Sequence, residues 1–276
     1  MDHETIEDII LKYSHRGMDA LRPYLPQYFC GDAAKEILSW RRGPVLLATG
    51  FYVAGHAETD GPAGTVVLAK ALQKLGFEPF VLTDETCSHY FEPEGLKTVY
   101  MSYEEGDAFC LSLLRSMQPA GLISIERCGE NVRGDYVNMH GESIRSHTAQ
   151  IDRLFDAAYG NVPTIGIGDG GNEIGMGNLA DVIAEKLPLV PCRTKVDRLV
   201  IATVSNWGAY GIAACLQKLS GVPVFPAFEE VKAYVQRTLL LGSVDGATEE
   251  NVCMVDGFSL TESEEVYEAL RQAAGA

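Results

Sequence analysis

Short runs of apolar residues alternate with longer helix-like stretches along most of the chain. The apolar runs cover residues 45–49, 80–83, 98–101, 122–125, 164–167 and 199–204, a length and continuity typical of buried parallel strands. Helical segments are expected between them at 63–76, 103–117, 146–159, 174–186 and 207–219. This alternation predicts an α/β fold with an open, doubly wound, mostly parallel sheet and helices on both faces.

The beginning of the chain follows a different pattern. Residues 4–42 predict two or three amphipathic helices, with a proline-marked break at 23–26. No linker rich in Pro, Gly or Ser interrupts the later strand and helix alternation. We therefore expect an N-terminal helical extension, residues 1–42, that packs against a single α/β unit, residues 43–276.

Composition and charge exclude several classes of protein. The 276 residues are 46% hydrophobic and 22% charged, which is ordinary globular usage and argues against disorder or a fibrous repeat. The formal net charge of −16 repels phosphate backbones and anionic lipid, so neither nucleic acid nor a membrane is an expected partner. An anionic small molecule requires a local Arg, a helix N-terminus or a bound cation.

Cysteine usage and the N-terminal residues bear on the compartment. The seven cysteines are odd in number and contain no C-x-x-C pair, which fits neither a disulfide framework nor a zinc site. The first residues lack the basic and apolar regions of a signal peptide, and no apolar run approaches ~18 residues. These features predict a soluble, cytoplasmic protein.

Polar residues gather where the predicted strands end, which is where ligands bind in open parallel sheets. The turn after the first strand, residues 49–64, starts at Thr49 and contains Asp60 as a predicted helix N-cap, with Pro62 in the first helical turn. Free backbone N–H groups there would receive an anion or a metal-bound substrate. The alternative is that Gly and Asp only shape a long loop and cap a helix.

Glu126 and Arg127 follow the predicted strand at 122–125 directly. As a site pair, Arg127 would grip a carboxylate with two hydrogen bonds, and Glu126 would bind a cation or transfer a proton. As ordinary structure, the two residues would form a surface ion pair that contributes little to stability. The sequence leaves both interpretations open.

A glycine-rich turn at 166–177 carries two acidic residues, Asp169 and Glu173. Its glycines permit positive φ and close approach of a ligand to the backbone, and its two carboxylates are the oxygen ligands that Mg²⁺ and Mn²⁺ prefer. A G-x-G-x-x-G pattern spans 166–171, but the Asp within it would repel a pyrophosphate, so no nucleotide cofactor is expected. A purely structural glycine turn is the alternative.

The last strand-end turn contains Ser205, Asn206 and Trp207, and a core position is the commoner fate of a lone aromatic such as this tryptophan. Asp245 and Asp256 are weaker candidates, because Asp-Gly is also an ordinary turn signal. The histidines have no metal-ligand spacing, and neither a G-x-S-x-G elbow nor a Walker loop is present. Serine hydrolase and P-loop chemistry are therefore disfavoured.

Taken in order, the segments TGF, ETDGPAG, ISIERCGENVRGDYVNMHGESI, TIGIGDGGNEIGMGN and SNWGAYG form a recognisable set. Over roughly residues 40–260 the chain resembles the D-glutamate cyclase family. In larger members a hydratase-like domain precedes this one, and the present sequence does not contain it. The resemblance implies a hydro-lyase that converts D-glutamate, an acidic amino acid, to 5-oxo-D-proline and water.

Strand-end position and side-chain chemistry assign roles for such a reaction. A divalent metal, Mg²⁺ or Mn²⁺, would be held by Asp60, Asp169 and Glu173. The catalytic residues would be Glu126, Asp169 and Glu173, with Glu126 or Glu173 as acid and base. The predicted substrate-binding residues are Thr49, Arg127, Asn172 and Asn206.

Two other functions fit the same pattern. A carboxylate-held divalent ion also suits a metal-dependent phosphatase that uses a metal-activated water. A sensor that binds an acidic amino acid without turnover, reporting through the N-terminal helices, is the third hypothesis. A homodimer is compatible with an α/β enzyme of this size, although no heptad or interface patch in the sequence specifies one.

Overall fold

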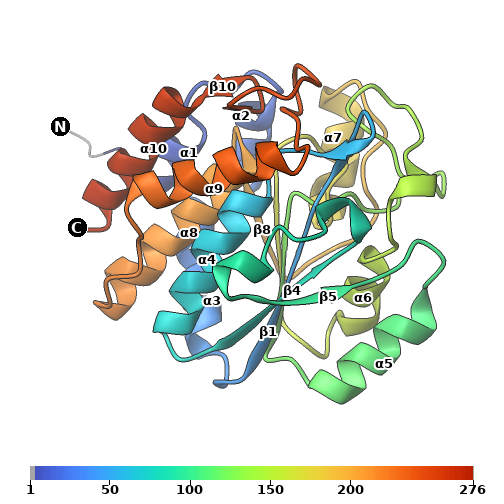
Figure 1. The fold of residues 1–276 in the computed structure, drawn as a ribbon, viewed down its shortest axis with the longest axis horizontal. Coiled ribbons are helices and arrows are strands. Elements are labelled where there is room, and N and C mark those ends of the chain that lie inside the picture. The colour runs from blue at the N-terminus through green and yellow to red at the C-terminus, as the bar shows by residue number, and fades with distance from the viewer. Residues whose placement is uncertain (1–3, 276) are drawn as a thin grey trace.

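A computed structural model describes residues 4–275 and shows a single open sheet of six parallel strands (Figure 1). The sheet order is β5-β4-β1-β6-β7-β8, with strands β1 (Pro44–Thr49), β4 (Glu78–Thr83), β5 (Lys97–Tyr100), β6 (Gly121–Ile125), β7 (Thr164–Gly168) and β8 (Arg198–Ile201). Two short antiparallel pairs lie outside it, β2 (Tyr52–Val53) with β3 (His56–Ala57) and β9 (Met254–Val255) with β10 (Phe258–Ser259). The predicted α/β class is confirmed.

Helices cover both faces of the sheet (Figure 1). On one face α3 (Phe29–Ser39), α4 (Pro62–Lys74) and α8 (Ser205–Ser220) pack together, with α1 (Ile6–Ile10), α9 (Phe228–Leu240) and α10 (Leu260–Ala273) around them. On the other face α5 (Asp107–Met117) packs against α6 (Asp152–Ala158). The remaining helices are α2 (Met18–Leu21) and α7 (Ala180–Lys186), which contact each other.

The strand order creates a crevice between β1 and β6. Numbered one to six along the chain, the sheet strands follow the order 3-2-1-4-5-6, so the chain proceeds outward from β1 to one edge and from β6 to the other. The helices that follow these two strands therefore leave on opposite faces. In open α/β sheets a ligand binds in the crevice outside the carboxyl ends of the strands at such a switch point.

The central strands are fully buried because helices cover both of their faces, which explains their continuous apolar sequence. The N-terminal segment packs onto the same body: α3 contacts α8 and β8. The backbone N–H of Thr203 donates to the Ile10 carbonyl at 2.9 Å, which fixes the end of α1 beside the last strand. Within residues 4–275, no helix is long and apolar enough to cross a membrane.

Several predicted elements are shorter than expected. The helix at 146–159 is limited to α6 and a preceding 3₁₀ turn at Arg145–His147. The helix at 174–186 begins only at Ala180, because Gly175 has a φ of +106°, which an α-helix does not allow, and a 3₁₀ turn follows at Met176–Leu179. Strand β8 ends before 202–204, where the chain leaves the sheet toward α8.

Candidate active site

Three carboxylates converge at the crevice between β1 and β6. Asp60 lies in the loop after β1, Glu126 directly follows β6, and Asp169 directly follows β7. Each contributes one oxygen to a group in which all oxygens lie within 4.8 Å of one another, and all three residues are buried. The sheet topology therefore brings together acidic residues that lie far apart in sequence, between positions 60 and 169.

The N-terminus of α8 points at this carboxylate cluster. The Ser205 N–H donates to Asp60 Oδ2 at 2.8 Å and to Asp169 Oδ2 at 3.0 Å, while the Ser205 hydroxyl donates to Glu126 Oε2 at 2.6 Å. The Asn206 N–H adds a bond to Asp60 Oδ1 at 2.8 Å. Free N–H groups and the helix dipole stabilise negative charge, so α8 orients all three carboxylates.

The backbone is unusual at three acidic positions of the site. Glu126 has a φ of +45°, Asp256 a φ of +54° and Glu249 a φ of +59°, in the left-handed region that favours glycine. Such conformations cost about 1 kcal/mol or more at a non-glycine residue and concentrate at functional sites. Here all three residues line one pocket.

Burial and mutual repulsion raise the pKa values of the cluster. Burial raises the pKa of Asp60 to about 6. The pKa of Glu126 is raised well above its ordinary value by burial and then by Glu173, and burial does the same for Asp169, although Arg16 opposes that shift. A group of this kind favours binding either protons or a cation, and three oxygen donors suit a hard divalent ion.

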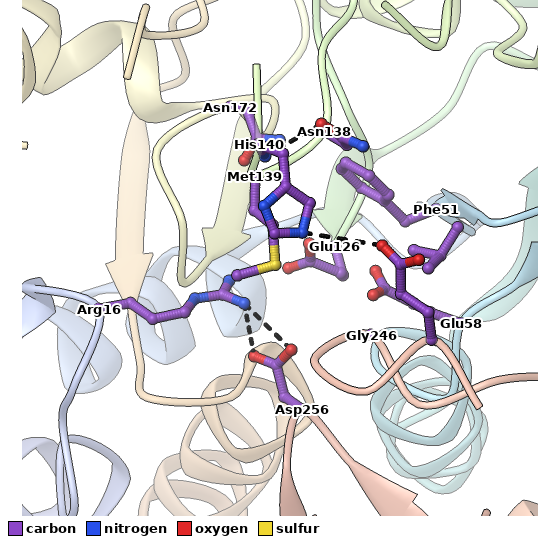
Figure 2. A pocket seen from close by; sticks show the side chains of 12 residues that line it. Arg16, Phe51, Glu58, Glu126, Asn138, Met139, His140, Asn172, Gly246 and Asp256 are labelled. Atoms are coloured by element: carbon purple, nitrogen blue, oxygen red, sulfur yellow. Dashed lines mark hydrogen bonds and ion pairs between the residues drawn. The ribbon is translucent and has the colours of Figure 1, made fainter. Parts of the chain in front are cut away.

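A pocket adjoins the carboxylate cluster, and Figure 2 shows the side chains that line it. Arg16 reaches in from one side and Glu58 lies on the opposite side, with Met139 and His140 nearby. The other lining residues are Phe51, Val53, Glu126, Asn138, Asn172, Gly246, Glu249 and Asp256. Arg16 Nη1 lies 2.9 Å from Asp256 Oδ2, and its Nη2 pairs with Asp169.

Glu173 lies beside the cluster but is occupied by backbone groups. Its carboxylate accepts the N–H groups of Asp169, Gly170 and Gly171 at 3.3, 2.6 and 2.7 Å. In dinucleotide-binding folds the glycine motif follows the first strand, whereas this glycine-rich bend follows the fifth strand of the sheet and wraps around Glu173. The structure thus groups Glu126, rather than the predicted Glu173, with Asp60 and Asp169.

Arg127 does not line the pocket. Its guanidinium is fully buried and pairs with Asp84 at 2.6 Å, and it donates to the carbonyls of Gly50 and Ala149 at 2.8 and 2.7 Å. The structure therefore corrects both readings of the sequence, since Arg127 is neither positioned to grip a substrate carboxylate nor part of a surface ion pair. It joins the loops that follow three different strands.

The other predicted substrate-binding residues have separate positions. Asn172 lines the pocket and donates to the Val137 carbonyl at 2.8 Å. Thr49 is buried at the end of β1, and its hydroxyl has no hydrogen-bond partner. The Asn206 amide is engaged with the loop that carries Asp60, because it accepts from Gly61 N–H at 3.1 Å and donates to the Thr59 carbonyl at 3.2 Å.

Arg16 and Glu58 were missing from the sequence-predicted site, and Asp256 was only a weak candidate. Glu58 had a usable signal, since it stands two residues before Asp60 in the same motif. Arg16 had none, because a loop between two amphipathic helices shows no pattern that points to a distant pocket. Asp245, the other weak candidate, accepts the N–H groups of Thr248 and Gly257 and braces the loop around the pocket.

The fold and this site define an α/β protein with a carboxylate-lined pocket at its topological switch point. A family model described as D-glutamate cyclase-like, C-terminal matches residues 6–271, and the chain belongs to this family. Human mitochondrial D-glutamate cyclase is 33% identical over 198 residues, which cover 62% of this chain and 32% of the human protein. The match thus spans about a third of that relative's length.

Proposed function

We propose that this chain catalyses the intramolecular dehydration of D-glutamate to 5-oxo-D-proline with the assistance of a divalent cation. Family membership supports the reaction class. The observation that carries the proposal is the buried cluster of Asp60, Glu126 and Asp169, which borders a pocket at the switch point of the sheet. A glutamate side-chain carboxylate requires neutralisation before an amine can attack it, and a cation held in this cluster would meet that requirement.

The reaction sets three chemical demands. The α-ammonium loses two protons in all and its nitrogen forms a bond to the side-chain carboxyl carbon, while the bond from that carbon to one carboxyl oxygen breaks and the oxygen leaves with both protons as water. Protein groups must therefore accept protons from the nitrogen and return them to the departing oxygen. The substrate must also fold back on itself, so that amine and carboxyl carbon meet in a near-attack geometry.

The residues present fit a divalent ion. Asp60 and Asp169 supply buried oxygens beside that of Glu126, and each of the two aspartates keeps a second oxygen for a fixed hydrogen bond or ion pair. When bound, such an ion would polarise the substrate's side-chain carboxylate and stabilise the charge of a tetrahedral intermediate. Mg²⁺ and Mn²⁺ both match this donor set.

Glu126 is the member of the cluster that lines the pocket, and we assign proton transfer to it. Its pKa is raised by burial and by neighbouring carboxylates, which favours uptake of a proton by this carboxylate. The Ser205 hydroxyl donates to Glu126 Oε2 and so fixes the carboxylate in place. Asn172 contributes an amide to the same pocket wall.

The experiment that tests the proposal is proton NMR of the purified chain with D-glutamate, with Mn²⁺ or Mg²⁺ in one sample and EDTA in another. Growth of 5-oxoproline signals only with metal is the expected result, and L-glutamate provides the matched stereochemical comparison. Product in both samples would support the cyclase reaction and exclude a requirement for the metal. Absence of product in both samples would contradict the proposed reaction.

The same cluster also suits a metal-dependent phosphatase, because a carboxylate-held ion activates water for attack on a phosphate ester. Release of phosphate from p-nitrophenyl phosphate, measured on the same preparation, separates this function from the cyclase. Saturable binding of D-glutamate without product would instead favour the sensor hypothesis.

A further inference from the structure

Arg16 is the sole arginine or lysine among the described residues that line the pocket. It belongs to the loop between α1 and α2, in the segment that the sequence predicts only to pack. His15 packs edge-on against Phe258 at 5.3 Å between ring centroids, and Gly17 adopts a φ of +88° against Leu187. Contacts on both sides therefore hold this loop at the pocket, and the Arg16 side chain is 18% exposed.

Carboxylates surround the Arg16 guanidinium. Its two terminal nitrogens pair with Asp169 and Asp256, which come from the turn after β7 and from the turn between β9 and β10. These pairs orient the planar guanidinium at the edge of the pocket. A guanidinium in a fixed orientation is suited to bind a carboxylate through two parallel hydrogen bonds.

Glu58 faces the pocket from the opposite side (Figure 2). It is 5% exposed, and its Oε1 is buried without a hydrogen-bond partner. A Cβ at Gly246 would overlap Glu58 Oε2 and would lie 3.1 Å from Asp256 Oδ1, so the absence of a side chain at Gly246 makes room for both carboxylates. A buried acceptor without a partner is costly unless a donor binds it.

The charges of an α-amino acid match this arrangement. The α-carboxylate needs a cation, and Arg127 is unsuited to the task because its buried guanidinium pairs with Asp84 and does not line the pocket. The α-ammonium needs an acceptor that the protein leaves unpartnered. Arg16 and Glu58 offer these two features on opposite sides of one pocket.

We propose that Arg16 binds the α-carboxylate of the substrate and Glu58 its α-ammonium, so that the two residues together recognise the amino-acid head group. The inference rests on the proposed function, since it presupposes that the side-chain carboxylate occupies the metal cluster. It makes the N-terminal segment part of the substrate site. Asp256 then holds the guanidinium in position when the substrate is absent.

Binding measurements that combine substitutions of Arg16 and Glu58 with ligands lacking one charged group test this proposal. Calorimetric dissociation constants are measured with Mn²⁺ present for D-glutamate, for 4-aminobutyrate, which lacks the α-carboxylate, and for glutarate, which lacks the ammonium. The wild type is expected to prefer D-glutamate over each analogue by roughly ten- to a hundredfold. Arg16→Met should abolish the preference over 4-aminobutyrate, and Glu58→Gln the preference over glutarate.

Several comparisons separate recognition from a structural role. Arg115→Met, at an exposed position on α5, is the matched control and should leave all three constants unchanged. Arg16→Lys should retain part of the preference, because a lysine keeps the charge without the paired donors. Mn²⁺ affinity, measured separately, should be the same in Glu58→Gln as in the wild type.

Two results would overturn the inference while leaving the proposed function intact. One is that Arg16→Met and Glu58→Gln still turn over D-glutamate and still bind it more tightly than 4-aminobutyrate and glutarate. The other is equal weakening of all three ligands by Arg16→Met and by Arg16→Lys, which would assign Arg16 a structural role. If the wild type binds none of the three compounds, both the inference and the proposed function are contradicted.

Discussion

Asp60 and Asp169 accept the same backbone N–H group, that of Ser205, at 2.8 and 3.0 Å. One donor thus holds oxygens from two carboxylates that follow different strands. Two ionised oxygens at such short range repel each other, so the arrangement is stable only with a proton or a cation nearby. The helix N-terminus lowers the repulsion but does not supply a full positive charge.

Asp169→Asn should therefore reduce turnover by a hundredfold or more, a loss typical of removing one charge-stabilising group. The amide keeps the shape of the side chain and accepts from Ser205, so the circular dichroism spectrum should not change. Formation of 5-oxoproline is followed by NMR, and Mn²⁺ affinity by calorimetry. Asp181→Asn on the exposed side of α7 is the control, and wild-type activity in Asp169→Asn would disprove the metal-site assignment.

The raised pKa of Asp60 predicts a pH-dependent stability of the metal-free protein. Its ordinary pKa is 3.8 and its folded pKa is about 6, so between these values the folded state holds a proton that the unfolded state has lost. The contribution of Asp60 to the free energy of unfolding is fully present below pH 3.8 and is lost as pH rises through 6. From pH 5 to pH 7.5 the loss is about 1–2 kcal/mol, or roughly 5 °C in Tm.

Thermal melts in EDTA at the two pH values measure this effect, and Asp60→Asn should reduce the difference between them. Mn²⁺ at pH 7.5 should raise Tm, because the ion binds the ionised cluster and stabilises the state it binds. A metal-free Tm with the same pH dependence in wild type and Asp60→Asn would contradict the assignment.

Much of the fold follows from physical constraints visible in the sequence. Strands covered on both faces must be apolar throughout, so runs such as 45–49 and 122–125 could be recognised without an alignment. Elements of two residues such as β9 and β10 are too short to show a period. The helix predicted from 174 failed because the backbone conformation of Gly175 depends on packing against β7 and not on apolar spacing.

The site was predictable where topology alone decides it. Asp60, Glu126 and Asp169 stand at strand ends, and parallel strands bring those ends to one edge. The bonds of Glu173 to three amides and of Arg127 to Asp84 depend on the path of each loop, which residue type does not encode. Figure 2 shows Arg16 within this pocket, although its loop precedes the whole sheet in sequence.

Glu126→Gln separates proton transfer from metal binding. Because Glu126 lines the pocket, we expect Mn²⁺ affinity to fall by less than about tenfold while kcat falls by 10²-fold or more, the contribution of a general acid or base. The Ser205 hydroxyl can still donate to the glutamine carbonyl, so the local structure is retained. Loss of Mn²⁺ binding in parallel with turnover would instead make Glu126 primarily a metal ligand.

Glu130 fixes the loop that carries Asn138, Met139 and His140 over the pocket. Its carboxylate accepts from Arg193 Nε at 2.9 Å and from Arg145 Nη2 at 3.0 Å. Glu130→Ala should cost about 1.5–3 kcal/mol, as expected for hydrogen bonds to charged groups, and should raise KM for D-glutamate.

Urea denaturation and hydrogen exchange of residues 131–148 measure the effect of Glu130→Ala. The exposed Glu185→Ala on α7 is the control, with an expected change within about 0.5 kcal/mol. Unchanged exchange in this loop together with an unchanged KM would exclude a role for Glu130 in positioning the pocket.

Gly64 sets the distance between α4 and the N-terminus of α8. An alanine Cβ there would lie 2.9 Å from Asn206 Cα and 2.9 Å from Ala209 Cβ, closer than packed carbon atoms tolerate. Alanine normally stabilises a helix by up to about 1 kcal/mol relative to glycine, but overpacking costs about 1–3 kcal/mol. Gly64→Ala should therefore lower stability and, by displacing the amides of Ser205 and Asn206 from the carboxylates, reduce Mn²⁺ affinity.

The matched comparison is Gly31→Ala in α3, where the nearest atom to the new Cβ is Tyr28 Cβ at 3.7 Å, an ordinary contact. This variant should gain up to about 1 kcal/mol, because the helix propensity of alanine is not opposed. Urea denaturation of both variants gives the two free energies of unfolding, and calorimetry gives the Mn²⁺ affinities. Equal stabilisation of Gly64→Ala and Gly31→Ala would show that α8 shifts to accommodate the new Cβ without cost. The positions of the carboxylates would then be set by the sheet and not by α8.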